Sequence, residues 1–296
     1  MIAALVDRLI RSQGWLDGFG DVVQRIVGGI YKVLGKPGRL LKSFLHGTWL
    51  GHALHPVITD IPVGAWTLAL VADILALTGH LSQQVGDFCV FIGVLGAIGA
   101  AVTGYTDFHE TFGHERRVGA LHGLLNTVVL VLYVVSGVLR LQGGSGNHGT
   151  AFALSVVGYV LLISSAYLGG HLVFAMGSMV NRSAFLDGPA DEYVAVGKPD
   201  DFLEGQMRKV LVGGLDILMV RYQGKLVAIS NVCAHAGGPL DEGELNGGVV
   251  TCPWHGSRFH VDSGRVIEGP STFDQPALRV RETDGQVQVK LAQPLH

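Results

Sequence analysis

Cys233-Ala234-His235 and, after sixteen intervening residues, Cys252-Pro253-Trp254-His255 are the two short stretches that decide the fold of the C-terminal part of this chain. Each stretch carries one cysteine and one histidine, in C-x-H and C-x-x-H spacing. Thiolates and imidazoles are the side chains that bind borderline and soft transition metals. The two stretches therefore predict two loops of one small domain that converge on a metal.

Two kinds of metal centre use two cysteines and two histidines. Zinc sites use this set, but they usually pair the cysteines in one knuckle and the histidines in the other. One of each per knuckle suits a [2Fe–2S] cluster with both thiolates on one iron and both imidazoles on the other. We predict that Cys233 and Cys252 bind the inner iron and that His235 and His255 bind the outer iron, with zinc as the alternative.

The run CAH…CPWHGSRF, with the later FHVDSG and Gly269-Pro270, resembles the Rieske [2Fe–2S] family over about residues 190–296. The resemblance implies a small all-β electron-transfer domain. High-potential members carry an extra cysteine pair and a sulfur-bonding tyrosine, where this chain has Gly238, Trp254 and Phe259. It retains Ser257. We therefore expect a reduction potential below about +50 mV, in the lower part of a range of roughly −150 to +300 mV.

Short β-rich runs surround the ligand stretches and are separated by Gly, Asp and Pro turns. Such runs build a small antiparallel sandwich or barrel with the two ligand loops at one end. The predicted strands are Lys209–Val212, Ile217–Tyr222, Leu226–Ser230, Val249–Thr251, Ala277–Val280 and Val287–Leu291.

Charge is distributed very unevenly along the chain. Only 15% of the 296 residues are charged, against about a quarter in soluble domains, and residues 43–115 contain no Lys or Arg. Residues 190–296, by contrast, hold 10 cationic and 14 anionic residues. The pattern predicts a membrane domain joined to a soluble domain. It excludes a disordered or ordinary cytosolic protein, and the net charge of −3 implies no nucleic-acid partner.

Four stretches are long and apolar enough to cross a bilayer, which takes roughly 20 residues. Asp60 and Pro62 are interpreted as the N-cap and first turn of the first span. Short links between spans predict an all-α four-helix transmembrane bundle. The spans are Pro62–Gly79, Phe88–Thr106, Gly119–Leu139 and about Ala151–Gly170. The chain is thus expected to be a multi-domain membrane protein, divided into residues 1–50, 51–182, 183–190 (linker) and 191–296.

Residues 1–50 are expected to form amphipathic helices on the membrane surface, because apolar residues recur at helical spacing between interrupting cations. The side of the membrane that holds the N-terminus carries ten Lys or Arg, and the opposite loops carry only Arg140. The positive-inside rule then places both termini and the Rieske domain in the cytoplasm of a bacterial inner-membrane protein.

Several of the 13 histidines gather at the predicted cytoplasmic end of the bundle. Histidines there could ligate haem b through two imidazoles, could form a quinone site, or could simply bond to loops and headgroups. The candidate ligands are His55, His122 and His171. Asp60, Asp73 and Asp107 are candidates to orient them. Asp73 lies eleven residues into the first predicted span, where an ionisable group is expensive and usually functional.

The membrane half also resembles an uncharacterised bacterial four-helix membrane family, through His55-Pro56-x-x-x-Asp60-x-Pro62 and Gly169-Gly170-His171. Other members commonly carry His where this chain has Asp60 and Met176. The resemblance implies the bundle and no activity.

The sequence favours a membrane-anchored electron-transfer protein, whose cluster exchanges single electrons with a soluble redox partner and a site in the bundle. The alternatives are a quinone-reactive oxidoreductase subunit, which would be an enzyme, and an iron–sulfur redox sensor. Membrane lipid and a redox protein are the expected partners.

Overall fold

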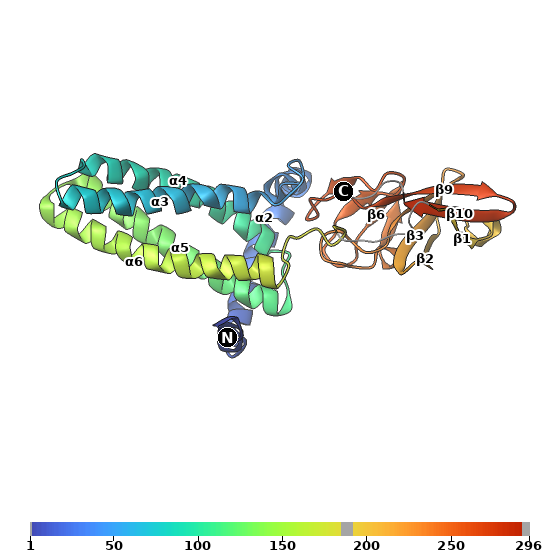
Figure 1. The fold of residues 1–296 in the computed structure, drawn as a ribbon, viewed down its shortest axis with the longest axis horizontal. Coiled ribbons are helices and arrows are strands. Elements are labelled where there is room, and N and C mark those ends of the chain that lie inside the picture. The colour runs from blue at the N-terminus through green and yellow to red at the C-terminus, as the bar shows by residue number, and fades with distance from the viewer. Residues whose placement is uncertain (1, 185–191, 292–296) are drawn as a thin grey trace. The chain divides into compact units, whose positions relative to one another are not determined.

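The computed structural model describes residues 2–184 and 192–291 of the chain (Figure 1). Its contacts divide the chain into two units. A membrane unit contains residues 1–38 and 53–178, and a Rieske unit contains residues 39–52 and 179–296. Most of the expected linker, residues 185–190, lies outside the described residues.

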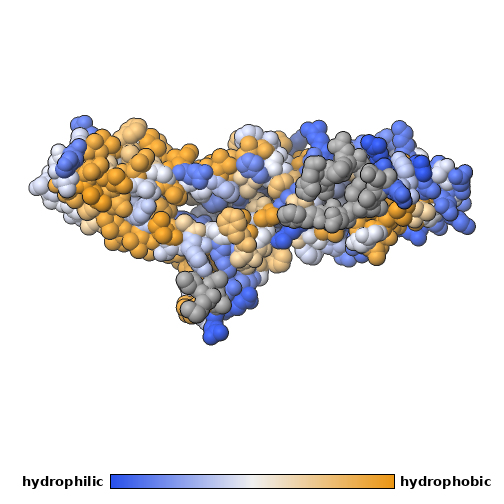
Figure 2. Space-filling model, in the orientation of Figure 1, coloured by the Kyte–Doolittle hydropathy of each residue, from blue (hydrophilic) through white to orange (hydrophobic). Residues whose placement is uncertain are grey.

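The membrane unit is helical. Helix α1 (Ile2–Arg11) and helix α2 (Trp15–His46), whose residues 39–46 belong to the Rieske unit, precede four long helices. The last of the four continues into a short π-helix, His171–Ala175. The four long helices are sufficiently long and apolar to cross a membrane, and Figure 2 shows an apolar outer surface over them. They are α3 (Leu54–Leu77), α4 (Gln83–Phe108), α5 (Gly113–Gln142) and α6 (Ser145–Gly170). The prediction of a four-span membrane bundle is confirmed.

The start of the first span was predicted wrongly. Helix α3 begins at Leu54 with Ala53 as its N-cap, so Asp60 lies in the second turn and Pro62 inside the helix. Proline inside a helix removes one hydrogen bond, which neighbouring packing tolerates in membrane helices. Pro62 is buried, and a proline buried in this way cannot be told from a first-turn proline by sequence alone.

Helices α3 and α4 pack as one hairpin and α5 and α6 as another. Corresponding positions of α3 and α5, each 67 residues apart in sequence, meet in the centre of the bundle. The ring of His55 lies edge-on to that of His122, with centroids 6.3 Å apart. Further along, Trp66 stacks on Tyr133 at 3.9 Å. Each central layer therefore takes one side chain from each hairpin.

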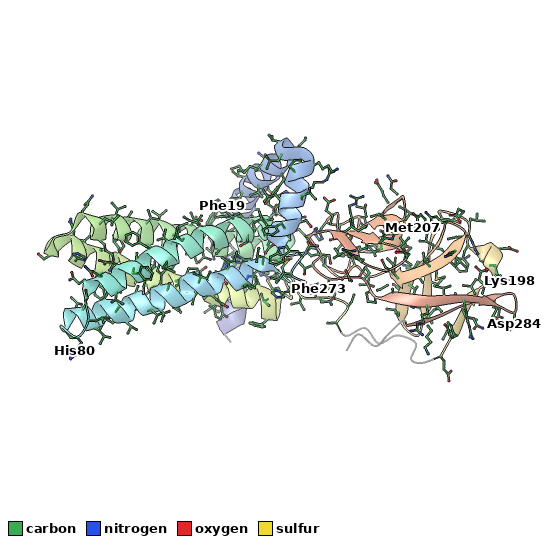
Figure 3. The ribbon with its side chains drawn as sticks, turned by 90° about the horizontal axis from the view of Figure 1, so that it is seen from above. Phe19, His80, Lys198, Met207, Phe273 and Asp284 are labelled. Atoms are coloured by element: carbon green, nitrogen blue, oxygen red, sulfur yellow. The ribbon has the colours of Figure 1, made fainter. Side chains whose placement is uncertain are left out.

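The third layer is an ion pair. Arg140 Nη1 and Nη2 donate to the two oxygens of Asp73 at 2.9 and 2.5 Å, and Nη1 also donates to Asp87 at 2.8 Å. Asp73 and His55 are 18 residues apart on one helix, which is about 27 Å. The prediction that Asp73 orients the histidines is therefore wrong, because Asp73 is bound to Arg140 near the other end of the bundle. Figure 3 marks that end with His80, which follows α3.

The Rieske unit contains two antiparallel sheets. The larger has the order β1-β10-β9-β4-β3-β2 and the smaller the order β5-β6-β7-β8. Their strands are β1 (Val194–Gly197), β2 (Met207–Val212), β3 (Leu215–Tyr222), β4 (Lys225–Ser230), β5 (Glu244–Asn246), β6 (Val249–Thr251), β7 (Arg258–His260), β8 (Val266–Glu268), β9 (Ala277–Thr283) and β10 (Gln286–Leu291). All six predicted strands are present.

Strand β3 joins two apolar cores because its successive side chains point to opposite faces. Ile217 and Met219 belong to a core with Val287 and Val289. Leu218 and Val220 belong to a second core, which also contains both cysteines of the ligand stretches, Cys233 and Cys252. The ligand loops are thereby packed against a strand whose residues Ile217–Val220 are all buried.

Candidate metal and redox sites

The two ligand loops have the same backbone design. Cys233 N–H donates to the carbonyl of Gly238 at 2.9 Å, and Gly237 N–H returns to the carbonyl of Cys233 at 2.8 Å. In the second loop, Cys252 N–H donates to the carbonyl of Ser257 at 2.8 Å, and Gly256 N–H donates to the carbonyl of Cys252 at 3.1 Å. Gly237 and Gly256 adopt positive φ values of 85° and 75°. Each loop is therefore a tight turn that needs glycine four residues after its cysteine.

The four sequence-predicted ligands come together as two pairs. The thiols of Cys233 and Cys252 are buried and in hydrogen-bond contact with one another. The rings of His235 and His255 lie edge-to-face, with centroids 4.9 Å apart and an interplanar angle of 84°, and both are half-buried. A sulfur pair inside and a nitrogen pair outside match the donor set of a two-iron cluster.

Hydrogen bonds favour a thiolate at Cys252 over Cys233. The bond from the Cys233 thiol lowers the pKa of Cys252 against the effect of burial, aided by the N–H groups of Trp254 and His255, and the same contact raises the pKa of Cys233. Donors aimed at the charged form lower a pKa, and the thiolate is the form that binds metal. The loop is therefore prepared for an anionic ligand sulfur.

A third loop, residues 269–276, supports both ligand loops. Gln275 is buried, accepts from Ala234 N–H at 3.0 Å and donates to the carbonyl of Val232 at 3.2 Å. Ser271 N–H donates to Ser257 Oγ at 2.9 Å. Sequence reasoning noted Gly269-Pro270 but did not identify Gln275, whose role depends on a long-range contact.

In the membrane unit, His55 and His122 have equivalent surroundings. His55 Nδ1 lies 2.9 Å from the carbonyl of Ala100, and His122 Nδ1 lies 2.9 Å from the carbonyl of Ser165. A carbonyl only accepts, so each Nδ1 carries the proton and each neutral ring keeps its lone pair on Nε2. This is the tautomer of a histidine that ligates through Nε2.

Small residues make room for these rings. A side chain at Gly104 would lie 2.7 Å from His55 Cε1, and one at Gly169 would lie 3.2 Å from His122 Cε1. Each glycine follows the carbonyl that binds the ring by four residues, so one helical turn supplies both the acceptor and the space. In the described structure Asn126 Nδ2 contacts His122 Nε2 at 3.1 Å.

The other members of the predicted haem set lie apart from this pair or interact with it weakly. His171 Nε2 donates to Asp7 Oδ1 at 3.1 Å, and His114 Nε2 donates to the same oxygen at 3.0 Å. His171 therefore anchors α1 instead of joining the pair. Asp60 is exposed on α3. Asp107 lies close enough to His55 to act on it electrostatically.

Comparison with known families agrees with this architecture. The Rieske [2Fe-2S] domain matches residues 192–280, and the predicted membrane protein family DUF2231 matches residues 51–182. The chain therefore belongs to the Rieske [2Fe–2S] family through its C-terminal domain, which is fused to a DUF2231 membrane domain. A Rieske domain implies a [2Fe–2S] cluster, and the two ligand pairs described above fit one.

Individual relatives cover the Rieske part. The ferredoxin component of the naphthalene 1,2-dioxygenase/salicylate 5-hydroxylase systems of Ralstonia sp is 32% identical over 92 residues, which are 31% of this chain and 88% of that protein. Apoptosis-inducing factor 3 of Homo sapiens is 34% identical over 96 residues, 32% of this chain and only 16% of that relative. The solved ferredoxin of carbazole 1,9a-dioxygenase from Nocardioides aromaticivorans IC177 is 29% identical, with 33% of this chain and 97% of that one covered at a TM-score of 0.32.

Proposed function

We propose that this protein is a membrane-anchored electron carrier whose Rieske cluster exchanges single electrons between a soluble redox partner and a centre inside the bundle. The observation that carries the proposal is the pairing of ligands, with buried thiols on one side and half-buried imidazoles on the other. Similarity to a dioxygenase-system ferredoxin component supports a soluble partner protein.

Cys233 and Cys252 would hold the inner iron, and His235 and His255 the outer one. The bound cluster would supply one-electron redox chemistry. The chain's own contribution is to fix the two tight turns, to exclude water from the thiols and to leave the imidazole edge accessible. Trp254, 51% exposed beside His255, extends this edge and offers apolar surface to a partner.

The centre inside the bundle is proposed to be haem b, ligated by His55 and His122. Both rings carry their proton on Nδ1, so Nε2 is the nitrogen that would bind a metal, and at His122 the metal would replace the hydrogen bond from Asn126. The two ring centroids lie 6.3 Å apart, so the pair would offer imidazole nitrogens from two helices to one haem, which would supply one-electron redox chemistry.

Orientation is proposed from charge. Arg140, the single cation counted on the outer side, is buried in α5 and paired with Asp73, so every unburied cation in the count lies on the other side. The positive-inside rule then puts both termini and the cluster in the cytoplasm. A cysteine introduced at His148 in a Cys89→Ser background should react with an impermeant thiol reagent in intact cells. Reaction only after lysis would reverse the orientation.

The central test is a paired measurement on detergent-purified protein expressed with adequate haem supply. Electron paramagnetic resonance should detect the Rieske signal, and a pyridine haemochrome assay should detect haem b. His55→Ala and His122→Ala should each remove haem and keep the Rieske signal, whereas His171→Ala should keep both. Wild-type protein with zinc and no acid-labile sulfide contradicts the cluster assignment. Wild type without haem contradicts the second centre and leaves the bundle as an anchor or quinone site.

A further inference from the structure

Residues 39–52, here named the strap, belong to the Rieske unit although they precede the first membrane helix. Helix α2 is broken at Gly35, whose φ of 57° and ψ of −128° are not helical, and Pro37 follows. The break separates the amphipathic part of α2 from the strap. Sequence reasoning treated the whole of residues 1–50 as membrane-surface helix, because the strap continues the same amphipathic pattern.

The strap contacts the segment that leads into the third loop. Gly269 N–H donates to Ser43 Oγ at 3.3 Å, and the Ser43 hydroxyl itself donates to Thr48 Oγ1 at 3.1 Å. Arg39 Nε lies 3.6 Å from Glu268 Oε1. A Cβ at Gly269 would meet Thr48 Oγ1 at 3.0 Å and His46 Cδ2 at 3.5 Å. His46 is completely buried.

From Gly269 a short hydrogen-bonded route leads to a ligand. Ser271, two residues on, donates its N–H to Ser257 Oγ at 2.9 Å, and the carbonyl of Ser257 accepts from Cys252 N–H at 2.8 Å. Ser257 is completely buried. Ser257 Oγ accepts this hydrogen bond, and its own O–H group is a further hydrogen-bond donor held beside Cys252.

We infer that the strap is a positioning element for the Rieske centre, in which Ser43 holds Gly269 and thereby sets the placement of Ser257 beside Cys252. The inference rests on the proposed function, because it concerns the same cluster. Hydrogen bonds toward the ligand sulfurs and exclusion of water set the reduction potential of an iron–sulfur centre. Through the strap, Ser43, which lies outside residues 192–280 matched by the Rieske family, helps to set that potential.

The experiment is a redox titration of full-length protein followed by electron paramagnetic resonance. Ser43→Ala removes the acceptor for Gly269, loosens Ser257 and lowers the potential. The ratio of reduced to oxidised cluster at a fixed potential should fall about threefold, equivalent to about 30 mV at 59 mV per tenfold change. Ser43→Thr, which keeps the hydroxyl, should restore the wild-type value.

Two further variants separate positioning from folding. Arg39→Ala removes an exposed ion-pair partner and should shift the potential in the same direction by less, with iron and sulfide content unchanged. Leu40→Ala, at a residue 67% exposed on the same segment, should leave potential and line shape unaltered. Wild-type potential in both Ser43→Ala and Arg39→Ala would overturn the inference. Absence of a Rieske signal in the wild type would instead overturn the proposed function.

Discussion

The molecule contains two histidine pairs that are built in opposite ways. His235 and His255 stand on tight loops within one small domain, half-buried beside two thiols. His55 and His122 stand on α3 and α5, with their Nδ1 atoms fixed by carbonyls of neighbouring helices. The first pair depends on local turns, and the second depends on how two hairpins pack. A pair made of local turns leaves a sequence signature, whereas a pair made by packing leaves almost none.

The largest expected effect tests the local pair. Cys233→Ser replaces a thiolate ligand by a hydroxyl that binds iron poorly, so the Rieske electron paramagnetic signal should disappear completely. Cys89→Ser is the matched control, because this cysteine lies in α4 and is not a ligand. Loss of the signal in the control, or its survival in Cys233→Ser, would contradict the proposal that the loop cysteines hold the cluster and the membrane unit does not.

The second effect tests dependence on packing. Arg140→Leu would leave Asp73 as a buried charge without its partner, because the two side chains are only 3% and 8% exposed. Removing one partner of a buried ion pair costs about 3–5 kcal/mol. Thermal unfolding of detergent-solubilised protein should show this loss. Asp87→Asn keeps the Arg140–Asp73 pair and should cost much less, so equal losses in the two variants would contradict the layer described here.

The third effect tests whether residues beside the two ligand loops set the reduction potential of the cluster. Phe259 is completely buried beside the cysteines, at the position where high-potential relatives carry tyrosine. In wild type, redox titration should give a potential below about +50 mV on the Rieske scale. Phe259→Tyr adds a hydroxyl that can donate a hydrogen bond to a ligand sulfur. The bond is worth about 1 kcal/mol, so the reduction potential should rise by roughly 40 mV for one electron. A wild-type potential near the top of the family range would show that the comparison with high-potential members is wrong.

The smallest effect concerns the anchor of α1. Hydrogen bonds from His114, opposed by burial and aided by His171, lower the pKa of Asp7 below its usual 3.8. A lowered carboxyl pKa stabilises the folded state above the unfolded pKa, and that stability is lost as pH falls through the folded value. Asp7 is partly exposed, so the contribution is below about 1 kcal/mol. Hydrogen exchange of α1 amides should rise slightly in Asp7→Asn at pH 7, and wild type should approach the variant below pH 4.

Most of the architecture was predictable from residues close together in the chain. The lack of Lys and Arg over residues 43–115 predicted the membrane half, and β-rich runs between turn residues predicted six of the strands. Strands β5, β7 and β8 are as short as β6 but were missed because they lack its unbroken run of β-branched residues. Strand β1 was missed because Val194–Gly197 is isolated in sequence from the strand it pairs with, β10.

The contacts that join distant residues were not predictable in the same way. The sequence gives no partner for Asp73, whereas the structure pairs it with Arg140, whose guanidinium binds both carboxylate oxygens. His171 was grouped with His55 because both were predicted on the same side of the membrane. Its hydrogen bond to Asp7 could not be predicted, because the sequence does not show where α1 packs.

The 67-residue correspondence of α3 and α5 has a consequence for how this chain can change. Each central layer is shared, so a mutation on one side alters the selection that acts on its counterpart. Neither Asp73 nor Arg140 can change alone without leaving a buried charge, and because Arg140 also binds Asp87 the two cannot simply exchange places. The same reciprocity makes the two hairpins complementary fragments. A chain cut in the loop at residues 109–112 would yield two fragments, each of which carries one residue of every central layer. Co-expression of the two fragments should reconstitute the bundle.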